Sequence, residues 1–347
     1  MINTNQHFNA PELNPPLFPF KKGRCKSRVI SGCILIICLW FNSVGATVFD
    51  LPEDPNEGVI GDPTKPFYTH AKEEDTLLDV ARRYDIGQNE ILLLNPGVDR
   101  WLPGTKVDIF IPTSRVLPDT PREGITLNLP EYRVYYFRPD KKTVETHPVS
   151  IGRQDWNTPI GKTKIVQKKA NPTWTPPESI KKEHLEKGEP LPDVVPAGPD
   201  NPLGLFALRL GIPGYLIHGT NKPYGVGMRV SHGCVRMYPE DIEKLFPEVR
   251  VGTPVYIVNQ PVKVGWWKKK IYIEVHPQLE GEELPYEKLY ENAMELIRKA
   301  FFRYHYQPEL VVDAQALKQA LEEKNGLPVA ITKMVGQNDN DPVDELF

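Results

Sequence analysis

The sequence predicts a mainly β domain, either a β-sandwich or an open barrel, with a small α+β domain and a C-terminal helical extension. Three observations lead to this fold class. Between positions 124 and 260, short β-branched and aromatic runs alternate with turn residues, as in sandwiches and barrels. Residues 66–113 combine strand-like and helix-like periodicity, and residues 261–334 contain two amphipathic helical patterns.

Length and composition limit the possible functions. With 347 residues, of which 40% are apolar and 25% charged, the chain can form about two or three soluble domains. Its 36 prolines are typical of many turns and short strands. Because the formal net charge is −3, the chain lacks the strong basic excess that phosphate binding requires, and nucleic acid is not an expected partner.

The first 46 residues are expected to form an export signal. A basic cluster at positions 21–28 precedes an apolar run at 29–41, and a cleavage pattern ends at Ala46. The run is short for a membrane span, and an uncleaved anchor is the alternative. Cleavage would change the net charge from −3 to −7 and leave Cys234 as the single cysteine. In an oxidising compartment, such a cysteine is either a buried filler or a free reactive thiol.

Residues 47–65 are rich in Pro, Asp, Glu and Gly and are expected to form a linker. Residues 66–113 then predict a strand, two helices and a second strand. Asp75 or Thr76 can cap the first helix, and the second ends before Asn95. These residues are expected to form a small separate domain.

The strand pattern of residues 124–260 has one long interruption. Residues 168–202 contain eight prolines in thirty-five positions, with a short helix predicted at 180–186. Trp174 and the pair at 194–195 indicate that this insertion packs against the domain. We therefore expect a functional lid, with a disordered loop as the alternative.

Beyond position 260, helices are predicted at 286–304 and 313–324, and the apolar stripe of the first is typical of a packing face. Residues 263–270 contain two tryptophans and four lysines. They are expected to be a strand edge with solvated charges, and a glycan-contacting patch is the alternative. Residues 335–347 are polar and acidic and are expected to be disordered.

The chemistry is concentrated in the stretch Ser231-His232-Gly233-Cys234-Val235-Arg236, with His218 sixteen positions before the cysteine. A thiol needs a base to become a nucleophile, and both imidazoles are candidates for that base. In a strand, His232 would point to the same face as Cys234. The backbone amides near Gly233 and Cys234 can receive an oxyanion, and Arg236 can bind a carboxylate.

Each of these residues also has a structural interpretation, since a lone histidine or arginine usually only stabilises the fold. Zinc is a further alternative for one cysteine and two histidines, but no fourth ligand lies at the usual spacing. Their combination with a single thiol in an exported chain favours nucleophilic acyl transfer.

His218-Gly219-Thr220 and the stretch 231–236 resemble the signature of the L,D-transpeptidases with a YkuD-type catalytic domain. Residues 158–161 and 196–204 support this resemblance. Residues 66–113 resemble the LysM module, which binds glycan chains containing N-acetylglucosamine. That likeness depends on residues 75–77, Asn95-Pro96 and 102–104, although Glu73-Glu74-Asp75 departs from the usual Pro-Gly-Asp turn. A domain that only packs on its neighbour is the alternative.

The family resemblance implies roles for individual residues. Cys234 would attack the stem peptide, His218 would be the base, the Gly219 carbonyl would orient it and His232 would support the site. The candidate substrate-binding residues are Arg236, Ser231, Gly233 and Trp174. The family uses no metal, no cofactor and no nucleotide.

The resemblance also implies the partners. They are peptidoglycan stem peptides and glycan strands in the periplasm, and the chain is most similar to the periplasmic subgroup that attaches an outer-membrane lipoprotein. The acyl acceptor would be a second diaminopimelate or a lipoprotein lysine. Two other functions remain open: hydrolysis of the thioester, and wall binding without catalysis.

Overall fold

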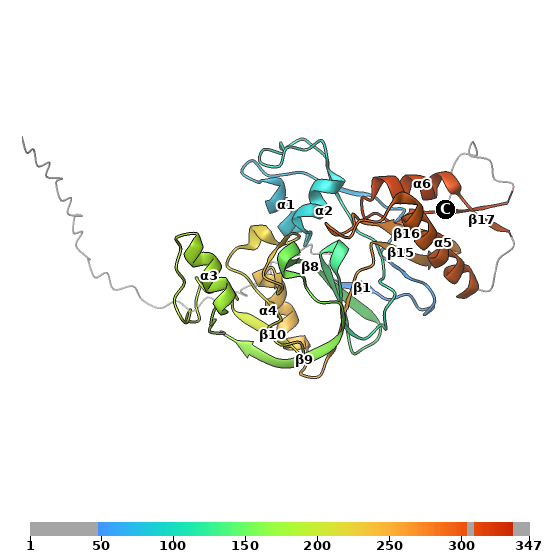
Figure 1. Cartoon of the computed structure of the whole chain (residues 1–347). Helices are drawn as coiled ribbons and strands as arrows, with labels where there is room; N and C mark the ends of the chain where they lie inside the picture. Colours follow the sequence, from blue (N-terminus) through green and yellow to red (C-terminus); the bar gives the residue numbers. More distant parts are fainter. Residues whose placement is uncertain (1–47, 304–308, 336–347) are drawn as a thin grey trace, which may run out of the picture. The chain divides into compact units, whose positions relative to one another are not determined.

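The computed structural model describes residues 48–303 and 309–335 (Figure 1). The predicted export signal at 1–46 and the predicted tail beyond Val335 lie outside these residues. No helix within the described ranges is long and apolar enough to cross a membrane.

The largest element of the fold is a ten-stranded sheet that closes on itself. Its strands are β1 (Val48–Asp50), β6 (Gly124–Asn128), β7 (Arg133–Phe137), β8 (Thr143–Gly152), β9 (Gly161–Ala170), β10 (Phe206–Leu210), β11 (Leu216–His218), β12 (Arg229–Ser231), β13 (Val235–Met237) and β14 (Pro254–Val258). The order is β1-β8-β13-β11-β10-β9-β14-β6-β7, and β7 pairs again with β8. The mainly β prediction is therefore confirmed, with a closed rather than an open barrel.

Two long strands close the barrel because each pairs with different neighbours at its two ends. The first half of β9 pairs with β14 and its second half with β10. In the same way, β8 pairs with β7 and then with β13. Apolar side chains from strands all around the barrel fill the interior, among them Ile125, Val149, Leu208, Ile217 and Val235. This packing makes the barrel a rigid support for the segments at its surface.

The connections of the barrel include one long insertion. Helix α3 (Glu178–Glu186) lies on the segment that joins β9 to β10. Since β9 continues to Ala170, the insertion begins later than the predicted position 168. Helix α4 (Pro239–Glu248) follows β13, and three short 3-10 helices complete this part of the chain. These are η1 (Leu129–Glu131), η2 (Gln154–Trp156) and η3 (Pro223–Gly225).

A small domain precedes the barrel and contains β3 (Phe67–Thr69), α1 (Leu77–Arg83), α2 (Gln88–Leu94) and β4 (Ile109–Ile111). Of the two candidate caps, Thr76 is the one used, in a capping box with Asp79. The side chain of Asn95 donates to the backbone oxygen of Phe110 at 3.0 Å and accepts from its N–H at 2.7 Å. Asn95 thus joins the end of α2 to β4.

The predicted linker at 47–65 is part of the fold. Strand β1 pairs with β8, and β2 (Val59–Ile60) pairs with β5 (Arg115–Val116). Val59 and Ile60 are buried. The polar composition of this segment predicted a linker. Its strands were not predicted because each is too short to show the alternation of apolar and polar residues that marks a strand.

The C-terminal extension contains sheets as well as the helices α5 (Tyr286–Arg303) and α6 (Ala314–Glu323). Strands β15 (Val262–Trp267), β16 (Lys270–Val275) and β18 (Val329–Ala330) form one sheet. A second sheet pairs β17 (Leu310–Val312) with β19 (Thr332–Met334). The extension is therefore α+β rather than helical, and residues 263–270 form a β-hairpin.

Buried charges join the small domain to the barrel. The Glu90 carboxylate on α2 lies 2.5 Å from Arg115 and 2.7 Å from Arg133 of β7. Burial alone would raise the pKa of Glu90, but the two guanidinium charges outweigh it and lower the pKa to about 2. The carboxylate is therefore a stabilising partner for two arginines that have little access to water.

Replacing Glu90 with alanine is expected to lower the free energy of unfolding by about 3–5 kcal/mol, because two buried guanidinium groups lose their anion. In the native protein, this stability should be complete above pH 4.3 and decline as the pH falls toward about 2. Urea denaturation measures both effects, with the exposed Glu73→Ala as the matched control. Equal unfolding energies for the two variants would contradict the assignment.

Candidate active site

The register of two parallel strands brings the predicted catalytic residues together. Ile217 of β11 is opposite Val235 of β13, and His218 is opposite Arg236. Ile217 and Val235 both lie in the barrel core. Because side chains alternate along a strand, His218 and Arg236 point to the other face. Cys234, one position before β13, is placed on that face by the same alternation.

The Cys234 thiol is half-buried, and it is the one cysteine within the described residues. Its Sγ lies 3.5 Å from the Gly214 backbone oxygen. Burial raises the pKa of the thiol, while a hydrogen bond from the Leu216 backbone and the charge of Arg236 act in the opposite direction. Cys234 is therefore a thiol at neutral pH and needs a base to become a nucleophile.

His218 has the properties of that base. Its Nδ1 lies 2.6 Å from the Gly219 carbonyl oxygen, so Nδ1–H donates and Nε2 keeps its lone pair. Burial, followed by the Arg236 charge, lowers the pKa of His218 to about 3. The imidazole is thus neutral at physiological pH. This contact is the one expected for Gly219.

The Gly219 position is closely packed, which explains part of the sequence signature. A side chain on Gly219 would lie 3.2 Å from Ile242 of α4, and one on Gly204 would lie 3.1 Å from the Gly219 backbone. Gly204 also has a φ of +65°, which favours glycine. The end of the stretch 196–204 therefore packs against the backbone beside His218, through Leu203 and Gly204.

The turn that carries the thiol is held by hydroxyl groups. Gly233 has a φ of +96°, and a β-carbon on it would lie 2.7 Å from the Tyr215 ring. The Thr158 hydroxyl donates to the Gly233 carbonyl at 2.8 Å, and the Ser231 hydroxyl donates to the Cys234 carbonyl. Ser231 is fully buried. Its hydroxyl therefore holds the turn, and a contact of Ser231 with substrate stays a prediction.

The same turn presents two backbone amides. In the part of the chain that the structure describes, the N–H groups of Gly233 and Cys234 donate no hydrogen bond. Their carbonyl groups are already used, so the amides are the polar groups still available beside the thiol. Such amides can stabilise an oxyanion that forms next to Sγ. Their role as an oxyanion site stays a prediction.

His232 lies elsewhere than predicted. His232 and Gly233 form a bend rather than a strand, and Gly233 has a left-handed conformation, so alternation does not place His232 beside the thiol. Its Nε2 lies 2.9 Å from Glu183 of α3, and its ring contacts Trp156 edge-to-face with centroids 5.2 Å apart. His232 therefore connects the catalytic turn to the insertion.

Glu183 is the functional candidate that the sequence does not reveal. Besides His232, its carboxylate pairs with Arg153, which follows β8, and with Lys187 at 2.6 Å. Hydrogen bonds from these three partners, with Arg153 first, hold the pKa of Glu183 well below its usual range. No motif contains Glu183, and only the packing of α3 on the turn brings it to the site.

Trp174 and Arg236 differ in how much they are already engaged. The backbone of Trp174 pairs with that of Val195, and the Asn201 side chain donates to the Pro172 oxygen at 2.8 Å. These contacts make Trp174 part of the base of the insertion, and they give no support to a substrate contact.

Arg236, by contrast, pairs with no carboxylate anywhere in residues 48–303 and 309–335. Its guanidinium is available for a substrate anion.

Two buried groups of acids and histidines could hold a metal ion. In the first, Glu131 and Glu274 already share the Lys263 ammonium, at 2.7 Å each. In the second, His147 lies 3.0 Å from Asp85 and 3.4 Å from Asp241. Although burial opposes it, these carboxylates raise the pKa of His147 well above its usual range, so the imidazolium is itself the cation. Both groups join the barrel to its neighbours.

A thiol, a neutral buried imidazole, two free amides and an unpaired arginine on one barrel face define an acyl-transfer site. The comparisons with known proteins agree with this class. The family model for the L,D-transpeptidase catalytic domain YkuD matches residues 122–257. This range contains every residue of the site described above.

Relatives extend the match beyond that domain. The chain is 44% identical over 253 residues to the probable L,D-transpeptidase YbiS of Escherichia coli K12, covering 72% of this chain and 81% of the relative. It is 40% identical over 254 residues to ErfK/SrfK of the same strain, covering 73% and 81%. It is 39% identical over 272 residues to the probable L,D-transpeptidase YcfS of Escherichia coli K12, covering 76% of this chain and 83% of the relative. The chain belongs to the L,D-transpeptidase family.

Proposed function

We propose that the protein transfers the acyl group of a peptidoglycan stem peptide to an amine through a thioester on Cys234. The observation that carries this proposal is the pairing of His218 on β11 with Arg236 on β13, with Cys234 directly before β13. A nucleophile, its base and an anion-binding group are then within reach of one peptide chain end.

The first half of the reaction forms the thioester. As Cys234 Sγ attacks the carbonyl carbon before the terminal D-alanine, the thiol proton moves to Nε2 of His218. The amides of Gly233 and Cys234 donate to the oxyanion. The C–N bond then breaks, and the D-alanine amine leaves with the proton from His218. Cys234 now carries the acyl group, and the base is neutral again.

The second half returns the enzyme to its first state. An amine attacks the thioester carbonyl and gives its proton to His218, and the C–S bond breaks as the new amide forms. The sulfur takes up the proton from His218. Water is the competing nucleophile, and a closed insertion over the site would exclude it. The contacts of α3 with the catalytic turn support this role for the insertion.

Substrate binding and base strength are linked through Arg236. Its charge is one reason why the pKa of His218 is so low. A substrate carboxylate paired with this guanidinium would offset the charge, and His218 would then bind a proton more readily. We therefore expect His218 to be the stronger base when substrate is bound.

Two amines are candidate acceptors, and the family subgroup supports both. One is the side chain of a second diaminopimelate, which gives a cross-link, and the other is the terminal lysine of an outer-membrane lipoprotein. The direct test incubates the purified protein with muropeptides and both amines in competition. Amide-linked products would support transfer and identify the acceptor, whereas hydrolysed peptides alone would support the hydrolase alternative.

The small domain at 66–113 supports a wall-directed location. We propose that it is a LysM module that binds glycan strands and that the chain is exported to the periplasm by residues 1–46. Cell fractionation tests the location, and binding of the purified chain to peptidoglycan sacculi tests the module. If sacculi bind but no acyl-enzyme forms, the non-catalytic wall-binding alternative is favoured.

We expect the variant Glu183→Ala to convert more thioester to hydrolysed product, by up to about tenfold relative to transfer, since about 1.4 kcal/mol corresponds to that ratio. The variant loses the contacts that hold α3 on His232 and Arg153, so water gains access. The matched control is Glu178→Ala, on the same helix but paired with Lys181 at the exposed surface. An unchanged ratio of hydrolysis to transfer in Glu183→Ala would contradict a role in closing the site.

A further inference from the structure

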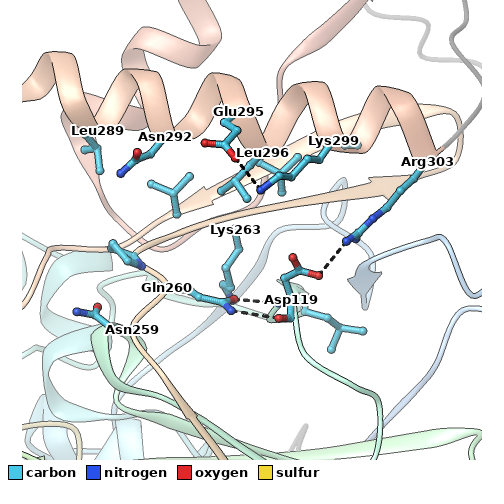
Figure 2. A pocket seen from close by; sticks show the side chains of 15 residues that line it. Asp119, Asn259, Gln260, Lys263, Leu289, Asn292, Glu295, Leu296, Lys299 and Arg303 are labelled. Carbon is cyan, nitrogen blue, oxygen red and sulfur yellow. Dashed lines mark hydrogen bonds and ion pairs between the residues drawn. The ribbon is translucent and has the colours of Figure 1, made fainter. Parts of the chain in front are cut away.

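A cavity of about 280 Å³ lies at the junction of the barrel and the C-terminal extension, on residues that the catalytic site does not use. Figure 2 shows it between α5 on one side and Asp119 and Gln260 on the other. Its lining includes the apolar side chains of Leu117, Val264, Leu289 and Leu296. The volume is near the lower end of the range for ligand pockets.

One wall of this cavity is the edge of a sheet. Strand β15 is the outer strand of the order β15-β16-β18, and Val262 and Val264 line the cavity. Two contacts show which backbone groups of β15 point toward β16. The His276 N–H donates to the Pro261 carbonyl at 2.8 Å, and the Gly58 N–H donates to the Trp266 carbonyl at 3.0 Å. The backbone of Pro261 thus faces β16, whereas that of Trp266 faces away from it.

Because the pattern repeats every two residues, Val262 and Val264 direct their N–H and C=O groups outward, as Trp266 does. Within residues 48–303 and 309–335, no hydrogen bond reaches these outward groups. The Trp266 end of the edge is already paired, because Glu57 forms a parallel bridge with it. The edge beside the cavity is therefore an unfilled continuation of a pairing that the protein already makes.

The charged side chains that line the cavity are already paired. Arg303 pairs with Asp119 at 3.2 Å, and Lys299 pairs with Glu295 at 2.8 Å. Lys263 pairs with Glu131 and Glu274 at 2.7 Å each. Asn292 makes no hydrogen bond in the described part of the chain, and Oδ1 of Asn259 is buried without a donor. The cavity thus offers amide groups and apolar walls, and each charged side chain in its lining already has a partner, which favours an uncharged ligand.

The cavity and the edge of β15 beside it together form a groove. We propose that this groove binds an extended, uncharged peptide segment of a partner protein, which adds as a strand to β15. Main-chain hydrogen bonds to Val262 and Val264 would hold the peptide, and one apolar side chain would enter the cavity. The groove is distinct from the catalytic face, so a partner could dock while the thiol works.

The probe is the blocked peptide acetyl-Thr-Val-Thr-Val-Thr-amide, and the readout is the amide NMR spectrum of the chain labelled with [15N]valine. The Val264→Ile variant assigns the Val264 resonance, since it removes that signal. We expect the Val262 and Val264 amides to shift on titration and to become protected from hydrogen exchange. Asn292→Trp should fill the groove and weaken binding by at least about tenfold.

The matched control is Arg298→Trp, because Arg298 is exposed on the same helix and does not line the cavity. This variant should bind the peptide as the unchanged protein does. Equal weakening in both tryptophan variants, or no shift at the two valines, would overturn the proposal. So would a Val264 amide that is protected before peptide is added, because the edge would then be occupied by this chain or by a second copy.

Discussion

Replacement of Cys234 by alanine is expected to abolish thioester formation and to reduce acyl transfer by about 10⁴-fold or more, as when a nucleophile is removed from an enzyme. The reason is chemical rather than structural. The Cys234 side chain is only half-buried and is not part of the barrel core, so the variant should keep the fold. The residual rate would come from binding and from the free amides of the turn.

Intact-protein mass spectrometry after treatment with a carbapenem measures this directly, because a reactive thiol should gain one covalent adduct. Ser231→Ala is the informative control. It removes a hydroxyl that holds the turn but leaves the thiol, so it should still form the adduct, more slowly. An adduct on Cys234→Ala, or normal transfer by that variant, would remove Cys234 from the mechanism.

His218→Gln is expected to lower the rate of transfer by about 10²–10⁴-fold, the range for loss of a general base. The parallel variant His232→Gln should cost much less, because His232 contacts Glu183 and Trp156 and acts only through the insertion. Comparing the two rates separates the two imidazoles that the motif alone leaves equivalent. A larger loss in His232→Gln would exchange their roles.

The pKa of His218 also sets the pH dependence. Since its folded pKa is about 3 and that of an unfolded histidine is about 6.5, the folded state keeps it neutral over this range. The free energy of unfolding therefore includes the full contribution of His218 above pH 6.5. This contribution is lost as the pH falls from 6.5 toward 3, because only the unfolded state binds a proton in that range. Activity should not decline through protonation of His218 in free enzyme between pH 7 and about 5. Stopped assays across this range, with a urea series at each pH, measure both.

Some elements of the fold could be predicted because their signals are local. The strands of the barrel follow β-branched runs, α1 begins at a capping box around Thr76, and α5 has an apolar stripe. Other elements depend on distant partners. Strand β1 is three residues long and is ordered by pairing with β8. Strands β15 and β16 form a mostly buried hairpin, but the exposed lysines at its turn make the sequence look like a solvent-exposed edge. Short-range periodicity cannot show such pairing.

The sequence by itself determined the chemistry: one thiol, two imidazoles, a glycine-rich turn and an arginine within nineteen positions, in an order that identifies the family. Only the tertiary structure decided which groups meet. The parallel register of β11 and β13 places His218 and Arg236 on the face of the thiol, while the left-handed turn at Gly233 sends His232 toward Glu183 on α3. Contacts between residues tens of positions apart depend on packing and register, and a linear motif carries neither.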